Sequence, residues 1–115
     1  MNKQLEIHDL TKYLAARSTC SVKVGAVIYD DDFRILSWGW NHSGSNGFGE
    51  CAERYAIRRS NRKRLNGSTI CIVSIRRNKM ITSLPCMKCA AAIKRAKIKF
   101  VEAQHIDGLR RVFSV

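Results

Sequence analysis

The stretch Thr69-Ile70-Cys71-Ile72-Val73-Ser74-Ile75 is apolar at almost every position, as is typical of a strand that is buried on both faces. Such a strand lies inside a sheet that is covered by helices on both sides. The segments around it alternate between helical and strand patterns, and this alternation favours the same arrangement. The sequence therefore predicts an α/β fold with one central sheet.

Before this strand, the pattern predicts a helix, a hairpin and a second helix. Apolar residues at roughly helical spacing predict an amphipathic helix over residues 3–17. Residues 22–40 predict a hairpin whose turn is the acidic run 30–32. Residues 51–65 contain neither Gly nor Pro and predict one helix, which Asn66-Gly67 ends.

After the apolar strand, the pattern predicts a helix over residues 86–97 and a fourth strand over 98–103. A fifth strand is predicted over residues 109–115, after Asp107-Gly108. The connection is too short for a crossover helix, so a fifth strand would return antiparallel. We therefore expect a single domain, residues 1–115, with a mixed sheet of four to five strands and helices on both faces.

The charge of the chain is strongly positive and unevenly distributed. Twenty-one Lys and Arg stand against nine Asp and Glu, which gives a formal net charge of +12. Residues 1–53 have a net charge of -2 and residues 54–115 a net charge of +14, with no carboxylate from 54 to 101. Such a surface attracts phosphates. A solvated basic face without a partner is the alternative.

Several classes of protein are excluded by the sequence. No segment approaches the roughly 18 apolar residues of a transmembrane helix, so we expect no membrane association. The N-terminal residues carry acidic side chains without a continuous apolar run, which is unlike a signal peptide. We therefore expect a protein of the reducing cytoplasm. Five cysteines make a poor disulfide framework there, and metal or nucleophile chemistry is the better use for some of them.

Two short strings at predicted helix starts carry the candidate chemistry: Cys51-Ala52-Glu53 and Pro85-Cys86-Met87-Lys88-Cys89. Cys86 and Cys89 are three residues apart, so they share a helix face and can bind one ion. A helix N-terminus lowers the pKa of a thiol toward the thiolate that a metal needs. Three thiolates leave the fourth tetrahedral position of Zn²⁺ open for water, as in a catalytic site. Glu53 can lie beside that water without binding the metal.

Two other interpretations of these cysteines are weaker. A redox pair of the thioredoxin type follows the first strand of its unit, whereas Cys86 and Cys89 come late in the chain. A structural zinc site would need Cys20 or Cys71 as a fourth thiolate. Cys71 lies within an apolar strand and Cys20 precedes one, where a small buried hydrophobic residue is the usual role.

The pattern Cys-Ala-Glu followed by Pro-Cys-x-x-Cys resembles the signature of the zinc-dependent cytidine and deoxycytidylate deaminase superfamily. The resemblance covers about residues 5–104. Ser18-Thr19-Cys20 and Gly39-Trp40-Asn41 are similar to deoxycytidylate deaminases, and the latter also to tRNA adenosine deaminases. Cys51-Ala52-Glu53-Arg54 is typical of free-nucleoside cytidine deaminases. The motifs are specific for the superfamily and mixed in the subfamily they favour.

The resemblance implies a three-layer α-β-α cytidine deaminase-like fold and hydrolytic deamination of cytosine to uracil. It implies Zn²⁺ held by Cys51, Cys86 and Cys89, which activates a water for attack on C4 of the ring. Glu53 would carry the proton of that water to N3 and then to the leaving amine. The resemblance and the neighbouring sequence also give candidate substrate contacts: Asn41 to the sugar, the backbone of Ala52 to the base edge, and Val24, Gly25, Ala26 and Trp40 around the pocket.

The substrate class stays open between a phosphate-bearing nucleotide of the dCMP type, which we favour, and cytosine in single-stranded DNA or RNA. Basic residues near both motifs are candidate phosphate or nucleic-acid contacts: Arg54, Arg76, Arg77, Lys79 and Lys88. Cys51 and a proline-free loop depart from the deoxycytidylate pattern. A neutral nucleoside as substrate would not explain the positive charge of residues 54–115.

Aromatic residues favour the polynucleotide alternative, because single strands bind to basic grooves with aromatic platforms. They are Trp38, Trp40, Phe48 and Tyr55. A third alternative is a non-catalytic, zinc-containing module that binds nucleic acid, which has no use for Glu53. Small deaminases of this superfamily are usually homo-oligomers, so the resemblance also implies self-association.

Overall fold

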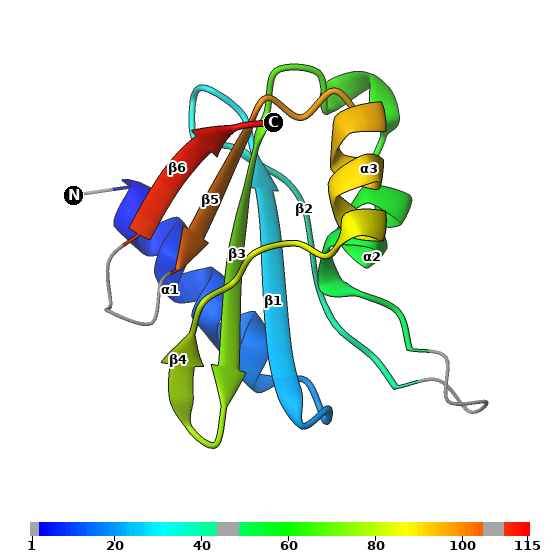
Figure 1. Ribbon diagram of the computed structural model, residues 1–115. Coiled ribbons are helices and arrows are strands. Elements are labelled where there is room, and N and C mark those ends of the chain that lie inside the picture. The colour runs from blue at the N-terminus through cyan, green and yellow to red at the C-terminus, as the bar shows by residue number, and fades with distance from the viewer. Residues whose placement is uncertain (1–2, 44–48, 105–109) are drawn as a thin grey trace.

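The computed structural model of the chain describes residues 3–43, 49–104 and 110–115. Within these ranges, six strands form one mixed sheet (Figure 1). Their bounds are Val22–Tyr29 (β1), Ile35–Trp40 (β2), Thr69–Arg76 (β3), Lys79–Ile81 (β4), Phe100–Gln104 (β5) and Arg110–Ser114 (β6). Five strands follow the order β2-β1-β3-β5-β6, and β4 pairs with the end of β3.

The strand directions agree with the mixed sheet that the sequence predicts. β3 and β5 are parallel, and all other pairs are antiparallel. The fifth predicted strand is β6, which returns antiparallel beside β5 as expected. Asp107 and Gly108, which were expected to precede it, lie outside the described residues.

Helices cover both faces of the sheet, which confirms the three layers (Figure 1). Helix α1, Lys3–Ala16, packs on one face, and helices α2, Ala52–Arg59, and α3, Met87–Arg95, pack on the other. Along β1, Val27 and Tyr29 point toward α1, whereas Ala26 and Ile28 point toward α2 and α3. None of the described helices is long and apolar enough to cross a membrane.

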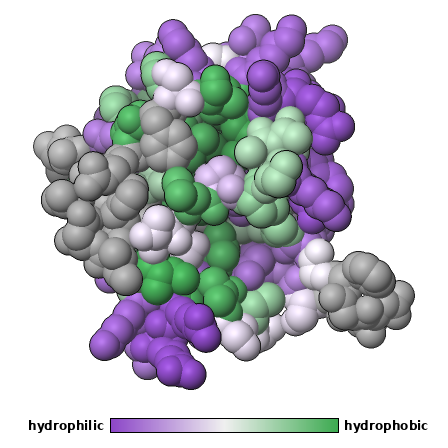
Figure 2. Space-filling view, in the orientation of Figure 1, coloured by the Kyte–Doolittle hydropathy of each residue, from purple (hydrophilic) through white to green (hydrophobic). Residues whose placement is uncertain are grey.

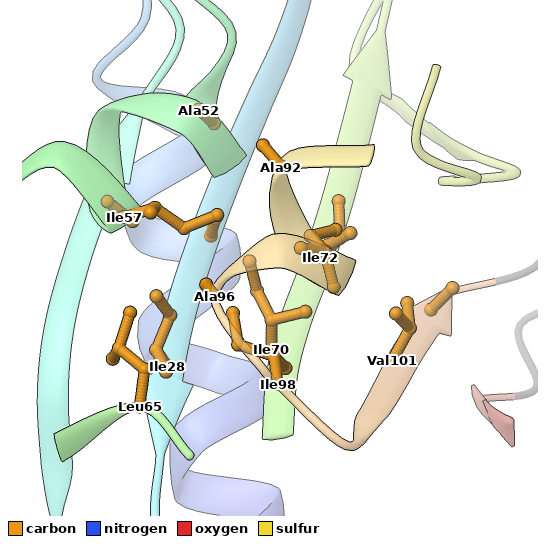
Figure 3. Close-up of a cluster of buried hydrophobic side chains, with 14 residues drawn as sticks. Ile28, Ala52, Ile57, Leu65, Ile70, Ile72, Ala92, Ala96, Ile98 and Val101 are labelled. Carbon is orange, nitrogen blue, oxygen red and sulfur yellow. The ribbon is translucent and has the colours of Figure 1, made fainter. Parts of the chain in front are cut away.

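The larger core lies between the sheet and the pair α2 and α3. Figure 3 shows isoleucines from β1, β3 and α2 pointing toward one another in this layer. Ile28, Ile70 and Ile72 are fully or almost fully buried here, with 0, 0 and 1% of their surface exposed. Burial of such side chains contributes roughly 1.5–3 kcal/mol each. This layer therefore fixes where the N-termini of α2 and α3 lie.

The single helix expected over residues 51–65 is wrong, because α2 ends at Arg59 and a separate 3₁₀ turn, η1, covers Arg62–Arg64. The hydroxyl of Ser60 donates to the carbonyl of Ile57 at 2.6 Å. The side chain of Asn61 then accepts from the backbone N–H of Lys63 at 3.1 Å. Ser and Asn compete with helical hydrogen bonds in this way even where Gly and Pro are absent.

Strand β4 is absent from the sequence-based expectation. It forms because Arg77 and Asn78 adopt φ values of 51° and 63°, which close a two-residue turn between Arg76 and Lys79. Asn tolerates this left-handed conformation, but Arg is not a usual turn residue. The pair therefore carries a weak turn signal in the sequence.

Candidate active site

Three thiols converge between the N-termini of α2 and α3. Cys51 and Cys86 are the N-cap residues of the two helices, and Cys89 lies in the first turn of α3. Their Sγ atoms all lie within 4.8 Å of one another. Ligands about 2.3 Å from a tetrahedral zinc ion lie roughly 3.8 Å apart, so small side-chain movements suffice to hold the ion. The three cysteines fit a zinc site with one open position.

The cap positions explain how the two helices present their thiols. Cys51 and Cys86 have extended backbones, with ψ values of 146° and 169°, and neither side chain caps its own helix. Their carbonyl groups instead accept the first helical hydrogen bonds, from the N–H groups of Tyr55 and Ala90. The side chains are thereby left to face the space between the helices.

The two cysteines of α3 lie in different electrostatic surroundings. A hydrogen bond from the backbone of Cys89 lowers the pKa of the Cys86 thiol. Burial raises the pKa of the Cys89 thiol, and the nearby charge of Glu53 raises it further. A cation among the three sulfur atoms is the group that would favour all three thiolates together.

Glu53 is a buried carboxyl beside the three thiols. It occupies the first turn of α2, lines the same cavity as Cys51 and Cys86, and is only 5% exposed. Burial raises its pKa above the ordinary value for a glutamate. A carboxyl with a raised pKa holds and releases a proton closer to neutral pH.

Arg54 turns back toward the sulfur atoms. Its Nη2 donates to the Sγ of Cys51 at 3.7 Å, and this contact raises the pKa of the guanidinium further. Three thiolates and one Zn²⁺ carry a net charge of -1, which a guanidinium at this distance partly offsets. The Nε of Arg54 is buried and has no hydrogen-bond partner among the described residues.

A cavity of about 480 Å³ opens onto this cluster. Its wall combines Cys51 and Cys86 with residues of β1 and β3, the segment after β2, and the segment before α3. Of the six predicted substrate contacts, Val24, Asn41 and Ala52 line it. Both ends of the Asn41 amide are engaged with β1, since Oδ1 accepts from Val24 and Nδ2 donates to Val22, each at 2.8 Å. One N–H and one lone pair of this amide remain for other partners.

Gly25, Ala26 and Trp40 are not among the described residues that line the cavity. Successive side chains of a strand point to opposite faces, so Gly25 and Trp40 lie on the α1 side of the sheet. A Cβ at Gly25 would come within 2.3 Å of the Thr11 carbonyl oxygen. Ala26 faces the cavity side but is fully buried in the core below it.

None of the predicted phosphate contacts is among the described residues that line the cavity. Arg76, Arg77 and Lys79 are exposed on the β3–β4 hairpin. Ser74, two residues before Arg76, does line the cavity. Lys88 is exposed in the first turn of α3.

His42, which carries no functional signal in the sequence, lines the cavity and pairs with Glu50. His42 and Glu50 exchange two backbone hydrogen bonds of 3.0 and 2.9 Å. The imidazole ring stacks on Trp40 and lies 4.7 Å from the ring of Tyr55. Pairing between positions eight residues apart leaves no local signal in the sequence. Phe48 lies outside the described residues.

The alternative of a structural site with four thiolates fails among the described residues. The metal-compatible cluster contains Cys51, Cys86 and Cys89 only. Cys71 is buried in the layer between the sheet and α1. Cys20 lines the cavity, and its thiol lies 3.9 Å from the carbonyl oxygen of Asn41.

Comparison with known proteins agrees with this geometry. The family model "Cytidine and deoxycytidylate deaminase zinc-binding region" matches residues 1–104. A cytidine deaminase from Burkholderia pseudomallei is structurally similar, with a TM-score of 0.78, 20% identity, and coverage of 99% of this chain and 93% of that one. Among curated proteins, none matches the chain by sequence.

A second structural relative is the dCMP deaminase of cyanophage S-TIM5. Its apo form has a TM-score of 0.67 and 25% identity over 88% of this chain and 82% of that chain. The same protein in complex with dCMP and dUMP has a TM-score of 0.61 and 21% identity over 88% and 81%. The family match spans both cysteine motifs, and the three-layer fold is shared. This chain therefore belongs to the cytidine and deoxycytidylate deaminase family.

Proposed function

We propose that this protein hydrolyses cytosine to uracil in a phosphate-bearing cytidine or deoxycytidine, as in a nucleotide of the dCMP type. Membership of the deaminase family supports the reaction class. The observation that carries the proposal is Glu53, a buried carboxyl on the wall of an open cavity beside three converging thiols. A zinc site that served only the fold would gain nothing from burying this carboxyl.

Cys51, Cys86 and Cys89 would hold Zn²⁺, which would supply a nucleophilic water by lowering the pKa of that water toward neutrality. The Glu53 carboxylate accepts the proton of that water and delivers it to ring N3. Once the water oxygen is bonded to C4, Glu53 would take the proton that remains on this oxygen and donate it to the amino group, so that the C4–N bond breaks, ammonia leaves and a C4 carbonyl remains. The raised pKa of Glu53 suits this exchange, because the group must take and give a proton in each cycle.

The phosphate of the substrate is assigned to the β3–β4 hairpin. Ser74 lines the cavity, and Arg76, Arg77 and Lys79 follow it on an exposed and acid-free segment. Guanidinium groups bind phosphate through paired hydrogen bonds. The complex of the phage enzyme with dCMP and dUMP gives independent support for a nucleotide.

Substitution of Glu53 tests the reaction. We expect Glu53→Gln to abolish the formation of uracil from dCMP while zinc content and unfolding temperature stay within error. Lys12→Gln, on the outside of α1, is the control. Full activity of the Glu53→Gln variant would contradict the proposal. So would a wild-type protein that deaminates none of the cytosine compounds tested.

Assays on matched substrates test the phosphate. We expect Arg76→Gln to raise the KM for dCMP about tenfold and to leave the KM for deoxycytidine unchanged, because only dCMP loses a charged hydrogen bond. An equal rise in the KM for dCMP and for deoxycytidine would show that the hairpin does not bind the phosphate.

Two further properties follow from the same site. The three thiols must stay reduced to bind zinc, which supports the reducing cytoplasm as the location.

We also propose self-association, because Leu84 and Met87 beside the cavity are 61% and 90% exposed. Large apolar side chains with so much exposed surface favour burial against a second subunit.

A further inference from the structure

Three residues on neighbouring segments of the sheet form a row along one side of the active-site cavity. Val24 of β1 pairs with Ser74 of β3, and its carbonyl accepts the backbone N–H of Asn41 at 3.0 Å. All three residues line the cavity. Neighbouring strands lie about 4.8 Å apart, so the two ends of this row are roughly 10 Å apart. The cavity therefore has an Asn41 end and a Ser74 end.

The Ser74 end continues into the basic tip of the β3–β4 hairpin. Arg76, Arg77 and Lys79 follow Ser74 closely in the chain and are exposed. Figure 2 shows strongly hydrophilic residues at this tip, at the bottom of the view. The proposed function places the phosphate of the substrate at this end.

The Asn41 end carries a carboxylate instead. Glu50 lines the cavity, and its two backbone hydrogen bonds with His42, of 3.0 and 2.9 Å, place it next to this end. Neither Lys nor Arg is among the described residues that line the cavity, whose carboxylates are Glu50 and the catalytic Glu53. A glutamate is ionised at neutral pH. The two ends of the cavity therefore differ in charge, with a carboxylate at one and the basic hairpin beyond the other.

Arg58 orients the Glu50 carboxylate and does not itself line the cavity among the described residues. Its Nε and Nη2 donate to the two carboxylate oxygens at 2.8 and 2.9 Å. An ionised carboxylate has about four acceptor positions, so two remain for other donors. The pair thus presents a fixed hydrogen-bond acceptor to a substrate. The two N–H groups that Arg58 directs at Glu50 are not free to bind a phosphate.

A fixed carboxylate distinguishes a hydroxyl from a phosphate at the same position. A hydroxyl donates a hydrogen bond to it, whereas an ionised phosphate is repelled by its charge. In dCMP, the sugar hydroxyl that the 5′-phosphate leaves free is the 3′-hydroxyl. Inside a DNA or RNA strand, the same oxygen carries a second phosphate.

We propose that Glu50 is a specificity-determining residue, which accepts a hydrogen bond from the 3′-hydroxyl of the substrate and excludes a phosphate at that oxygen. The proposal rests on the deaminase function above. It limits the substrate to a nucleotide that is phosphorylated on the 5′ side only, with the phosphate at the Ser74 end and the hydroxyl at the Asn41 end. Cytosine within a strand is rejected.

The first experiment compares three substrates that differ only at the 3′ carbon: dCMP, 2′,3′-dideoxycytidine 5′-monophosphate and deoxycytidine 3′,5′-bisphosphate. We expect the kcat/KM of the wild type to fall about tenfold or more when the hydroxyl is absent, because a hydrogen bond to a charged group is lost. It should fall further when a phosphate replaces the hydroxyl. Equal values for dCMP and the dideoxy compound would overturn the proposal.

Two substitutions of Glu50 test whether this residue is the cause. Glu50→Ala should lower the kcat/KM for dCMP to that for the dideoxy compound, and leave the latter value unchanged. Glu50→Gln keeps the size of the side chain without its charge, and should raise the kcat/KM for the bisphosphate relative to dCMP about tenfold. Glu6→Gln, at an exposed acid of α1, is the control for net charge. Substrate ratios that stay at their wild-type values in both Glu50 variants would overturn the proposal.

Arg58→Gln separates substrate contact from a merely structural role of the ion pair. This variant loses the pair but keeps the Glu50 carboxylate, so we expect it to discriminate against the bisphosphate at least as strongly as the wild type. If the pair served only to hold α2 and the preceding segment together, Arg58→Gln and Glu50→Ala would change the substrate ratios alike. That result would overturn the proposal.

Turnover of dCMP separates this proposal from the proposed function. A wild type that deaminates dCMP, with unaltered substrate ratios in the Glu50 variants, would refute the role of Glu50 and leave the deaminase function standing. A wild type that deaminates no cytosine compound would refute the function, and this proposal with it. An oligonucleotide with an internal cytosine that is deaminated as efficiently as dCMP would overturn the exclusion of strands alone.

Discussion

The hydroxyl of Tyr29 donates a hydrogen bond of 2.8 Å to the carboxylate of Glu102, in the layer between the sheet and α1. Burial is the main cause that raises the pKa of Tyr29 above its ordinary value of 10.0, and the contact with Glu102 adds to it. The folded state therefore holds the phenol proton more tightly than the unfolded chain does. The resulting stabilisation is complete below pH about 10 and is lost as the pH rises toward the folded-state pKa.

At this single residue, Tyr29→Phe should lower the free energy of unfolding by about 1–3 kcal/mol at neutral pH, because Glu102 loses a buried hydrogen-bond donor. Urea unfolding at pH 7 and at about pH 10.5 should show the gap between variant and wild type narrowing at the higher pH. Tyr13→Phe, at an exposed tyrosine of α1, is the control. A gap that stays constant with pH would contradict the assignment.

Single residues also show which parts of the site a sequence can predict. The spacing of Cys86 and Cys89 puts both on one helix face, and the resemblance brings Cys51 and Glu53 to them; the three thiols do converge, and Glu53 lines the cavity beside them. Gly25 and Trp40 belong to strands, where the side that a residue faces depends on register and on which helix covers each face. The resemblance placed them near the pocket, and the alternation of β1 and β2 puts them on the other side of the sheet.

At the level of helices and strands, the accuracy of each prediction depends on how strong the local sequence signal is. β3 is apolar throughout and was predicted within one residue of its bounds, Thr69–Arg76. The end of α2 and the presence of β4 were missed, because each depends on a few polar residues. Ser60 and Asn61 end the helix through their side-chain hydrogen bonds. Asn78 turns the chain with a positive φ.

The β3–β4 hairpin gives the element-level prediction. Asn78 has a φ of 63°, which β-branched residues avoid, so Asn78→Val should destabilise the protein by about 1 kcal/mol or more. Asn78→Gly accepts this conformation and should be close to neutral. If the hairpin holds the phosphate of dCMP, the valine variant should also raise the KM for dCMP while the glycine variant does not. Equal KM values for the two variants would indicate that the turn does not position the phosphate contacts.

For the whole molecule, the cluster of Cys51, Cys86 and Cys89 joins the N-termini of α2 and α3. Metal that binds only the folded state stabilises it by mass action. A strong chelator should therefore lower the unfolding temperature by several degrees, and added Zn²⁺ should restore both the temperature and the activity. Cys86→Ser should have this lower unfolding temperature even without a chelator. An unfolding temperature that does not respond to chelation would show that these helices need no ion to stay in place.

Self-association gives a second prediction at this scale. Met87 is 90% exposed at the start of α3, so Met87→Asp should shift the protein toward the monomer in sedimentation equilibrium if this residue lies in a subunit interface. Lys94→Asp, on the same helix but at a charged position, is the control. A monomeric wild-type protein would refute the expectation directly.

The close approach of α1 to Gly25 has a consequence for how this enzyme can change. Val24 lines the cavity, and the next residue lets the backbone of α1 approach β1, with the Thr11 oxygen and the Ala15 nitrogen facing the missing Cβ. At this point only β1 separates the cavity from α1, which packs on the other face of the strand. Substitutions in α1 that shift that helix would widen or narrow the substrate pocket from behind. Altered base selectivity can thus arise in residues that no substrate ever touches.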